Sequence, residues 1–94
     1  MIRHIVLSVF KEEHKHELED YKRRLTEMAA GIKEVKKMDI FFNVGAETNY
    51  DAVLISEFES MDDFEKYLQN DKHKDVAAYV NSIREKASII QFEV

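Results

Sequence analysis

Apolar residues run almost without interruption from Ile2 to Phe10, and β-branched and aromatic side chains dominate this run. Such a run is typical of a strand that is buried on both faces. Side chains alternate along a strand, so one face carries Ile2, His4, Val6, Ser8 and Phe10, and the other carries Ile5, Leu7 and Val9. A strand of this kind needs cover on each side.

Farther along the chain, apolar residues recur at steps of three and four, which predicts a long amphipathic helix. Its apolar positions are Leu18, Tyr21, Leu25, Met28, Ile32 and Val35. Acidic residues crowd its expected first turn, and Lys33, Lys36 and Lys37 crowd its expected last turn, which suits the helix dipole. Gly31 lies inside this pattern and indicates a bend or a close packing contact.

The second half of the chain predicts a hairpin, a broken helix and a closing strand. Residues 38–46 and 50–59 have strand patterns, and the turn-like residues 45–49 join them. Ser60 and Asp63 form a capping box that opens a short helix. Asn70 and Asp71 interrupt it, a second helical stretch covers residues 74–86, and residues 87–94 form the last strand.

This order, β-α-β-β-α-β with a broken second helix, predicts an α+β ferredoxin-like sandwich with a four-stranded antiparallel sheet. Ninety-four residues make one domain, residues 1–94. Helices on one side leave the other sheet face open, yet that face is apolar. Its residues are Ile5, Leu7, Val9, Val53 and Ile55. We therefore expect a homodimer that packs sheet against sheet into an α+β barrel.

Composition removes several classes of function. The chain has no cysteine, which excludes disulfides, thiolate metal sites and a cysteine nucleophile. A net charge of −5 argues against nucleic-acid binding. No apolar stretch approaches the roughly 20 residues of a membrane helix, so we expect no membrane contact and a cytoplasmic protein. Neither a glycine-rich phosphate loop nor a GxSxG elbow is present.

Five segments in order, MIRHIVLSVF, YDAVLISEFES, DDFEKYLQN, HKDVAAYV and IIQFEV, resemble the stress-responsive A/B barrel (Dabb) family over nearly the whole chain. The resemblance implies a dimeric α+β barrel, in agreement with the argument from the uncovered sheet face. It fixes chemistry less well than fold, because many members have no assigned activity and a few are polyketide cyclases. Fold-level analogy alone does not establish a reaction.

The resemblance implies three candidate catalytic residues. His4 and His73 match two histidines that cyclase-type relatives keep in a cavity between sheet and helices, and Tyr67 matches a tyrosine in that cavity. In that interpretation His73 is the base, Tyr67 positions the substrate, and His4 supports or protonates the developing enolate, with no cofactor. We expect the rest of the lining to be mostly apolar, from Val6, Ser8, Leu54, Ser56 and Phe58.

Two functions stay open on the sequence. The protein either binds a small hydrophobic or aromatic metabolite, with or without acid-base chemistry, or it is a non-catalytic barrel whose dimer is the functional unit. A ligand-sized void beside His4, with both histidines at its wall, favours the first. His14 and His16 carry no metal prediction, because an i, i+2 pair on a helix points to different faces.

Overall fold

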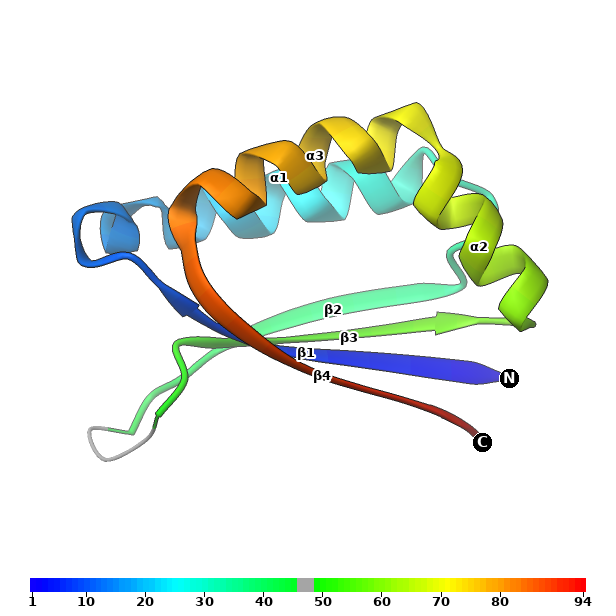
Figure 1. The fold of residues 1–94 in the computed structure, drawn as a ribbon, viewed down its shortest axis with the longest axis horizontal. Coiled ribbons are helices and arrows are strands. Elements are labelled where there is room, and N and C mark those ends of the chain that lie inside the picture. Colours follow the sequence, from blue (N-terminus) through cyan, green and yellow to red (C-terminus); the bar gives the residue numbers. More distant parts are fainter. Residues whose placement is uncertain (46–48) are drawn as a thin grey trace.

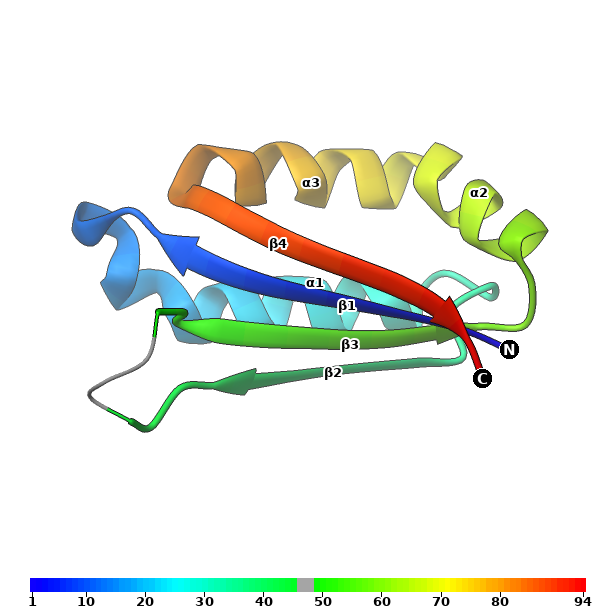
Figure 2. The same cartoon turned by 60° about the horizontal axis from the view of Figure 1, so that its bottom comes forward.

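The computed structural model describes residues 1–45 and 49–94, and within them four strands and three α-helices form two layers (Figure 1). Along the chain these are β1 (Ile2–Phe10), a 3₁₀ helix (Glu12–Glu17), α1 (Leu18–Ala30), β2 (Lys37–Phe42), β3 (Ala52–Phe58), α2 (Met61–Gln69), α3 (Asp71–Ile83) and β4 (Arg84–Glu93). The sheet order is β2-β3-β1-β4, and each neighbouring pair is antiparallel (Figure 2). The predicted ferredoxin-like α+β fold, with its broken second helix, is confirmed.

The helices cover one face of the sheet, so buried and half-buried side chains alternate along the two central strands. On β1 and β3 the side chains at even positions are buried, apart from half-buried His4, so they lie on the face that α1 and α3 cover (Figure 1). The odd positions, from Ile5 to Val9 on β1 and at Val53 and Ile55 on β3, are only half-buried. The predicted division of the sheet into a covered and an uncovered apolar face is therefore what the chain adopts.

Helix α1 ends at Ala30, so the prediction of a helix reaching Val35 with three lysines in its last turn is wrong. Gly31 closes the helix, and its amide donates to the Met28 carbonyl at 3.0 Å. Lys72, from the start of α3, donates through Nζ to the Gly31 carbonyl at 3.1 Å. A Cβ on Gly31 would lie 2.9 Å from that Nζ, so glycine permits the close approach. A distant lysine thus supplies the cation that a helix carboxyl end favours.

The break between α2 and α3 lies at Asn70. The predicted cap of α2 is confirmed, because Ser60 Oγ accepts from the Asp63 amide at 3.2 Å. Asn70 is extended, and its Oδ1 accepts from the Lys72 amide at 2.9 Å. It therefore caps α3, which begins at Asp71 and not at Lys74 as the apolar spacing predicts.

The end of α3 also differs from the prediction. The helix stops at Ile83, and β4 begins at Arg84, three residues before the expected strand start, because pairing with β1 already includes Arg84 opposite Phe10. The β2-β3 hairpin is confirmed by its antiparallel register. The predicted turn over residues 45–49 includes residues 46–48, which lie outside the described residues. None of the helices in the described part of the chain has the length and hydropathy needed to cross a bilayer.

Candidate functional site

A cavity of about 380 Å³ lies between the sheet and the helices. This is near the lower end of the roughly 300–1,000 Å³ that small-molecule sites occupy. Most of its wall is apolar, and a few polar side chains stand at separate places. The lining residues are His4, Val6, Tyr21, Leu25, Met28, Leu54, Phe64, Tyr67, Leu68, His73, Val76, Ala77, Val80, Asn81, Arg84 and Ile89.

His4 reaches the cavity from the covered face of β1. Its Nδ1 lies 2.7 Å from Oε1 of Gln91, the residue opposite it on β4. Because an amide oxygen only accepts hydrogen bonds, Nδ1 carries the proton and Nε2 of the neutral ring is an acceptor. Burial lowers the pKa of His4, and the hydrogen bond with Gln91 opposes this shift in part. His4 is therefore a neutral imidazole near pH 7.

His73 reaches the cavity from the first turn of α3, where its ring centroid lies 4.3 Å from that of Tyr67. Its Nδ1 is buried and has no hydrogen-bond partner among the described residues. Burial lowers the pKa of His73, and the charge of a protonated His4 would lower it further. The Leu68 backbone opposes the shift in part but does not meet the geometry of a hydrogen bond with Nδ1.

Tyr67 stands on the cavity side of α2 and is 6% exposed. Its ring packs against His73 on one side and Phe58 on another, at centroid distances of 4.3 and 5.0 Å. Burial, together with the neighbouring Tyr21, raises the pKa of Tyr67 well above its ordinary value. The phenol thus keeps its proton throughout the physiological range and can serve as a hydrogen-bond donor.

The structure brings His4, His73 and Tyr67 to one cavity, but divides the five residues expected to line it. Val6 and Leu54 are part of the wall. Ser8, Ser56 and Phe58 are 1%, 1% and 0% exposed and lie in the core, outside the described wall. The rings of Phe64 and Tyr67 from α2 pack directly against Phe58. Alternation identifies the covered face, but not which part of it stays open.

Three polar lining residues escaped the sequence reasoning. Tyr21 was an apolar position of the first helix, and Asn81 and Arg84 fell inside the expected helix over residues 74–86. Burial raises the pKa of Tyr21, while the Arg84 charge and the Ser8 hydroxyl oppose that shift. The sequence offered one sign of these residues: Tyr21 carries a hydroxyl group, whereas the other apolar positions of the first helix are aliphatic residues or methionine.

This arrangement can move a proton without any added group. Neutral histidine accepts protons near pH 7, and a protonated phenol can donate a hydrogen bond to a carbonyl oxygen or to the enolate formed from it. An apolar wall strengthens such interactions where a ligand displaces water from it. Together they suit the removal of a proton from carbon beside a carbonyl group.

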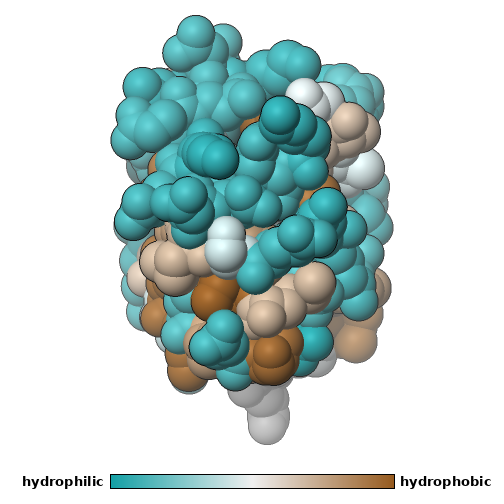
Figure 3. All heavy atoms as spheres, turned by 90° about the vertical axis from the view of Figure 1, so that its right-hand side faces the viewer, coloured by the Kyte–Doolittle hydropathy of each residue, from teal (hydrophilic) through white to brown (hydrophobic). Residues whose placement is uncertain are grey.

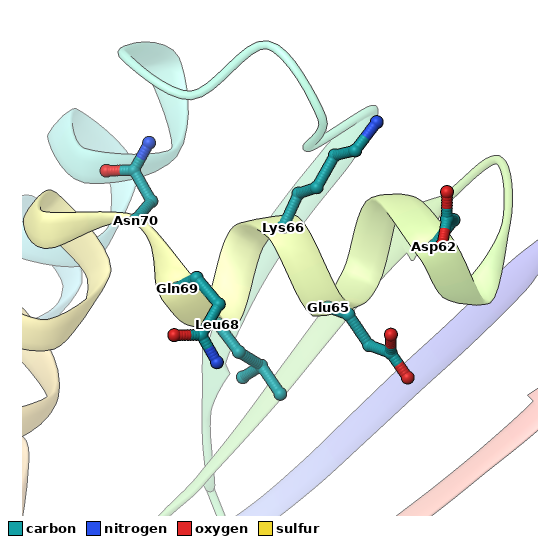
Figure 4. A pocket seen from close by; sticks show the side chains of 6 residues that line it. All are labelled: Asp62, Glu65, Lys66, Leu68, Gln69 and Asn70. Atoms are coloured by element: carbon teal, nitrogen blue, oxygen red, sulfur yellow. The ribbon is translucent and has the colours of Figure 1, made fainter.

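A second hollow, of about 430 Å³, lies on the outer side of α2 (Figure 4). Its wall consists of Asp62, Glu65, Lys66, Leu68, Gln69 and Asn70. These are surface side chains of one helix and its end, and they point in different directions. We assign it no chemistry.

Metal binding has no support in the described residues, where no three side chains of the ligating types gather closely enough to hold an ion. His14 Nδ1 instead contacts the Glu17 carboxylate within the same 3₁₀ segment. His16, two residues after His14, is exposed to solvent.

The fold and the cavity define a class of protein, a ferredoxin-like α+β domain with a small site between its sheet and its helices. A family model, the stress responsive A/B barrel domain (Dabb), matches residues 2–94. The chain belongs to the Dabb family, as the resemblance in its sequence predicts. No curated protein sequence matches it.

Solved structures share this fold. A dimeric protein of unknown function from Bacteroides fragilis has a TM-score of 0.88 at 20% identity, covering 99% of this chain and 95% of its own. A dimeric ferredoxin-like protein of unknown function from Thermobifida fusca has a TM-score of 0.88 at 24% identity, covering 99% and 90%. The hydroxynitrile lyase of Passiflora edulis has a TM-score of 0.88 at 16% identity, covering 99% and 92%. Identities this low establish the fold alone.

Proposed function

We propose that this protein is a homodimeric barrel that binds a small hydrophobic or aromatic carbonyl compound in each subunit and moves a proton on it without a cofactor. One observation carries the proposal. Two neutral histidines and a protonated tyrosine line the same mostly apolar cavity, so a proton acceptor and a hydrogen-bond donor stand in one place.

The hydrogen bond of His4 refines the roles expected from the sequence. With Nδ1 donating to Gln91, His4 Nε2 is the free acceptor, so we assign the base to His4. His4 Nε2 takes the proton from carbon, leaving an imidazolium and an enolate. The Tyr67 hydroxyl holds the enolate oxygen, and His73 fixes the Tyr67 ring and contacts the ligand through its own ring. The role of base thus moves from His73 to His4, and support of the enolate moves from His4 to Tyr67.

The dimer is supported by the uncovered sheet face. Phe41, Ile90 and Phe92 are 55%, 60% and 36% exposed, and their register places them beside the half-buried odd positions of β1 and β3. Figure 3, which looks at one end of the molecule, shows polar residues over the helical layer and hydrophobic residues, mixed with polar ones, over the sheet layer. An apolar patch of this kind favours association, although charged residues such as Arg3 and Glu57 share the same face. The partner we propose is a second copy of the chain, with the two sheets face to face.

One observation favours the alternative, a non-catalytic barrel whose dimer is the functional unit. The hydrogen bond between His4 and Gln91 would exist without any ligand and would by itself justify a histidine on β1. In both versions a cytoplasmic location and the absence of a nucleic-acid partner stay predictions from the sequence.

Deuterium exchange distinguishes the two functions without knowledge of the natural substrate. The probe is butyrophenone in D₂O, and proton NMR follows the loss of the signal from the carbon beside its carbonyl. We expect exchange above the protein-free rate. His4→Gln and Tyr67→Phe should each lower the protein-dependent rate by about 10²-fold or more, as for loss of general acid-base catalysis. His16→Gln, which changes an exposed histidine, is the matched control.

The ring signals of the four histidines provide the binding measurement. If butyrophenone shifts His4 and His73 but exchange stays at the protein-free rate, the cavity is a binding site and the proton transfer is refuted. If it shifts neither ring and no exchange occurs, the non-catalytic barrel is the better account. His73→Ala should abolish the ligand response with little change in the melting temperature; a large loss of stability would instead assign His73 a structural role.

A further inference from the structure

Arg84 is the one charged side chain in the described wall of the cavity, and the wall contains no Asp or Glu. Among the described residues its guanidinium forms no ion pair, and its hydrogen-bond partner is Asn81, whose Oδ1 lies 3.4 Å from Nη2. In this protein 19 acidic residues outnumber 14 basic ones. An unpaired guanidinium beside an apolar cavity is therefore unlike the exposed arginines of α1, where Arg23 and Arg24 both pair with Asp20.

A β-bulge gives Arg84 this position. From Ile2 to Val9 the register pairs β1 and β4 residue for residue, with Val9 opposite Lys86, but Phe10 then lies opposite Arg84 and not Glu85. The extra residue places Arg84 on the covered face with Phe10. Without the bulge, Glu85 would take that place and bring a negative charge to the cavity. Bulges commonly redirect a side chain beside a functional site.

The groups around Arg84 suit an anion. Asn81 lies within reach of its guanidinium, and Tyr21, which also lines the cavity, is close enough for the arginine charge to lower its pKa against the effect of burial. Amide and phenol groups donate hydrogen bonds to carboxylate oxygens. A guanidinium is cationic at every physiological pH.

Arg84 and His4 stand toward opposite ends of the cavity floor. His4 and Phe10 are six residues apart on β1, roughly 20 Å at 3.3 Å per residue. The side chain of Arg84 extends from the Phe10 end toward the cavity that it lines. Between the two ends the wall is formed by apolar side chains such as Val6, Val80 and Ile89.

We propose that the ligand is an elongated organic acid, with a carboxylate bound by Arg84, an apolar middle, and a carbonyl group at the end where His4 and Tyr67 stand. This rests on the proposed function and specifies its substrate class. A carboxylate meets the fork of a guanidinium through two parallel hydrogen bonds, which fixes the ligand's direction in the cavity.

The test compares 5-oxo-5-phenylpentanoate with its primary amide, which has the same shape without the charge. Isothermal titration calorimetry measures both with the wild-type protein. We expect the carboxylate to bind about 10- to 100-fold more tightly, as for hydrogen bonds to a charged group. Arg84→Gln should weaken the carboxylate to the level of the amide and leave the amide unchanged. Arg84→Lys should restore part of the preference.

Lys74→Gln is the matched control, because it removes the same charge from an exposed position on α3. Equal binding of acid and amide by the wild-type protein would overturn the carboxylate assignment and leave the proposed carbonyl site standing. Binding of neither compound would overturn both. If Arg84→Gln does not fold, the wild-type ratio of the two affinities decides, and a ratio near one refutes the inference.

Discussion

Replacing Ile55 with lysine should separate the dimer into folded monomers. Ile55 lies in the middle of the uncovered sheet face, between Ile5 on β1 and Asp39 on β2. It is half-buried within the protomer, so a long polar side chain can extend over the face without displacing the core. Asp39 stands directly opposite and can pair with the new ammonium, which helps the monomer fold.

The size of the effect follows from what the dimer would bury. Complete burial of an isoleucine side chain is worth about 1.5–3 kcal/mol. Ile55 is already partly buried in the protomer, and association can cover at most about the remaining third, so about 0.5–1 kcal/mol per protomer and about 1–2 kcal/mol per dimer are lost. Each lysine must also be desolvated or forced aside, a cost of several kcal/mol per ion in proteins, of which Asp39 recovers at most about 1 kcal/mol. A total near 5 kcal/mol weakens association by about 10³- to 10⁴-fold.

Sedimentation velocity over a range of concentrations measures the change, and far-UV circular dichroism reports whether the monomer is folded. Ile55→Val should remain dimeric. Met61→Lys makes a matched change at an exposed apolar position on α2, away from the sheet face, and should also remain dimeric. A wild-type protein that sediments as a monomer, or an Ile55→Lys variant that sediments as the wild type does, would refute the assignment of this interface.

Three further predictions concern the histidines and the helix cap. The pKa values of His4 and His73 are lowered below 6.5 in the folded protein, so the unfolded chain binds protons at these residues first as the pH falls. The stability they contribute should therefore be fully present above about pH 6.5 and decline below it. Urea titrations at several pH values should show a smaller decline for His73→Asn. Gln91→Leu removes the group that raises the pKa of His4, so NMR should find that pKa lower still; an unchanged value would contradict the hydrogen bond. Asn70→Ala removes the cap of α3 and should cost about 1 kcal/mol in urea unfolding, against no measurable loss for exposed Gln69→Ala.

Local patterns were sufficient for most of the fold. The alternation from Ile2 to Phe10 predicted which side chains of β1 face the helices, and the Ser60 cap predicted where α2 begins. Both predictions depend only on residues that are close together in the sequence. The end of α1 was mispredicted because the apolar spacing continues to Ile32 and Val35, whereas the helix stops at Gly31, whose carbonyl accepts from Lys72, forty-one residues later. No periodicity contains a contact of that separation.

The site was predictable only in part, for a different reason. His4, Tyr67 and His73 were found through family resemblance, which carries information on position that spacing alone does not. Arg84 was missed because it fell inside the helix expected over residues 74–86, whereas it begins β4. Even on a strand its direction depends on the bulge opposite Val9 and Phe10, because a one-residue shift in register exchanges the two faces of a strand. With a regular register, the same sequence would place the Glu85 side chain on the covered face in place of Arg84.

The cavity lowers the stability of the protomer, and burial of the uncovered sheet face in a dimer can compensate for that loss. A chain of 94 residues has little surplus stability, yet it leaves about 380 Å³ unfilled between its layers. Filling that space with larger side chains would stabilise the protomer but remove the site. Burying the opposite sheet face in a dimer supplies stability from surface that the cavity does not use. We therefore expect monomeric Ile55→Lys to unfold at lower urea concentration than the wild-type dimer, and a bound carboxylate to recover part of that loss.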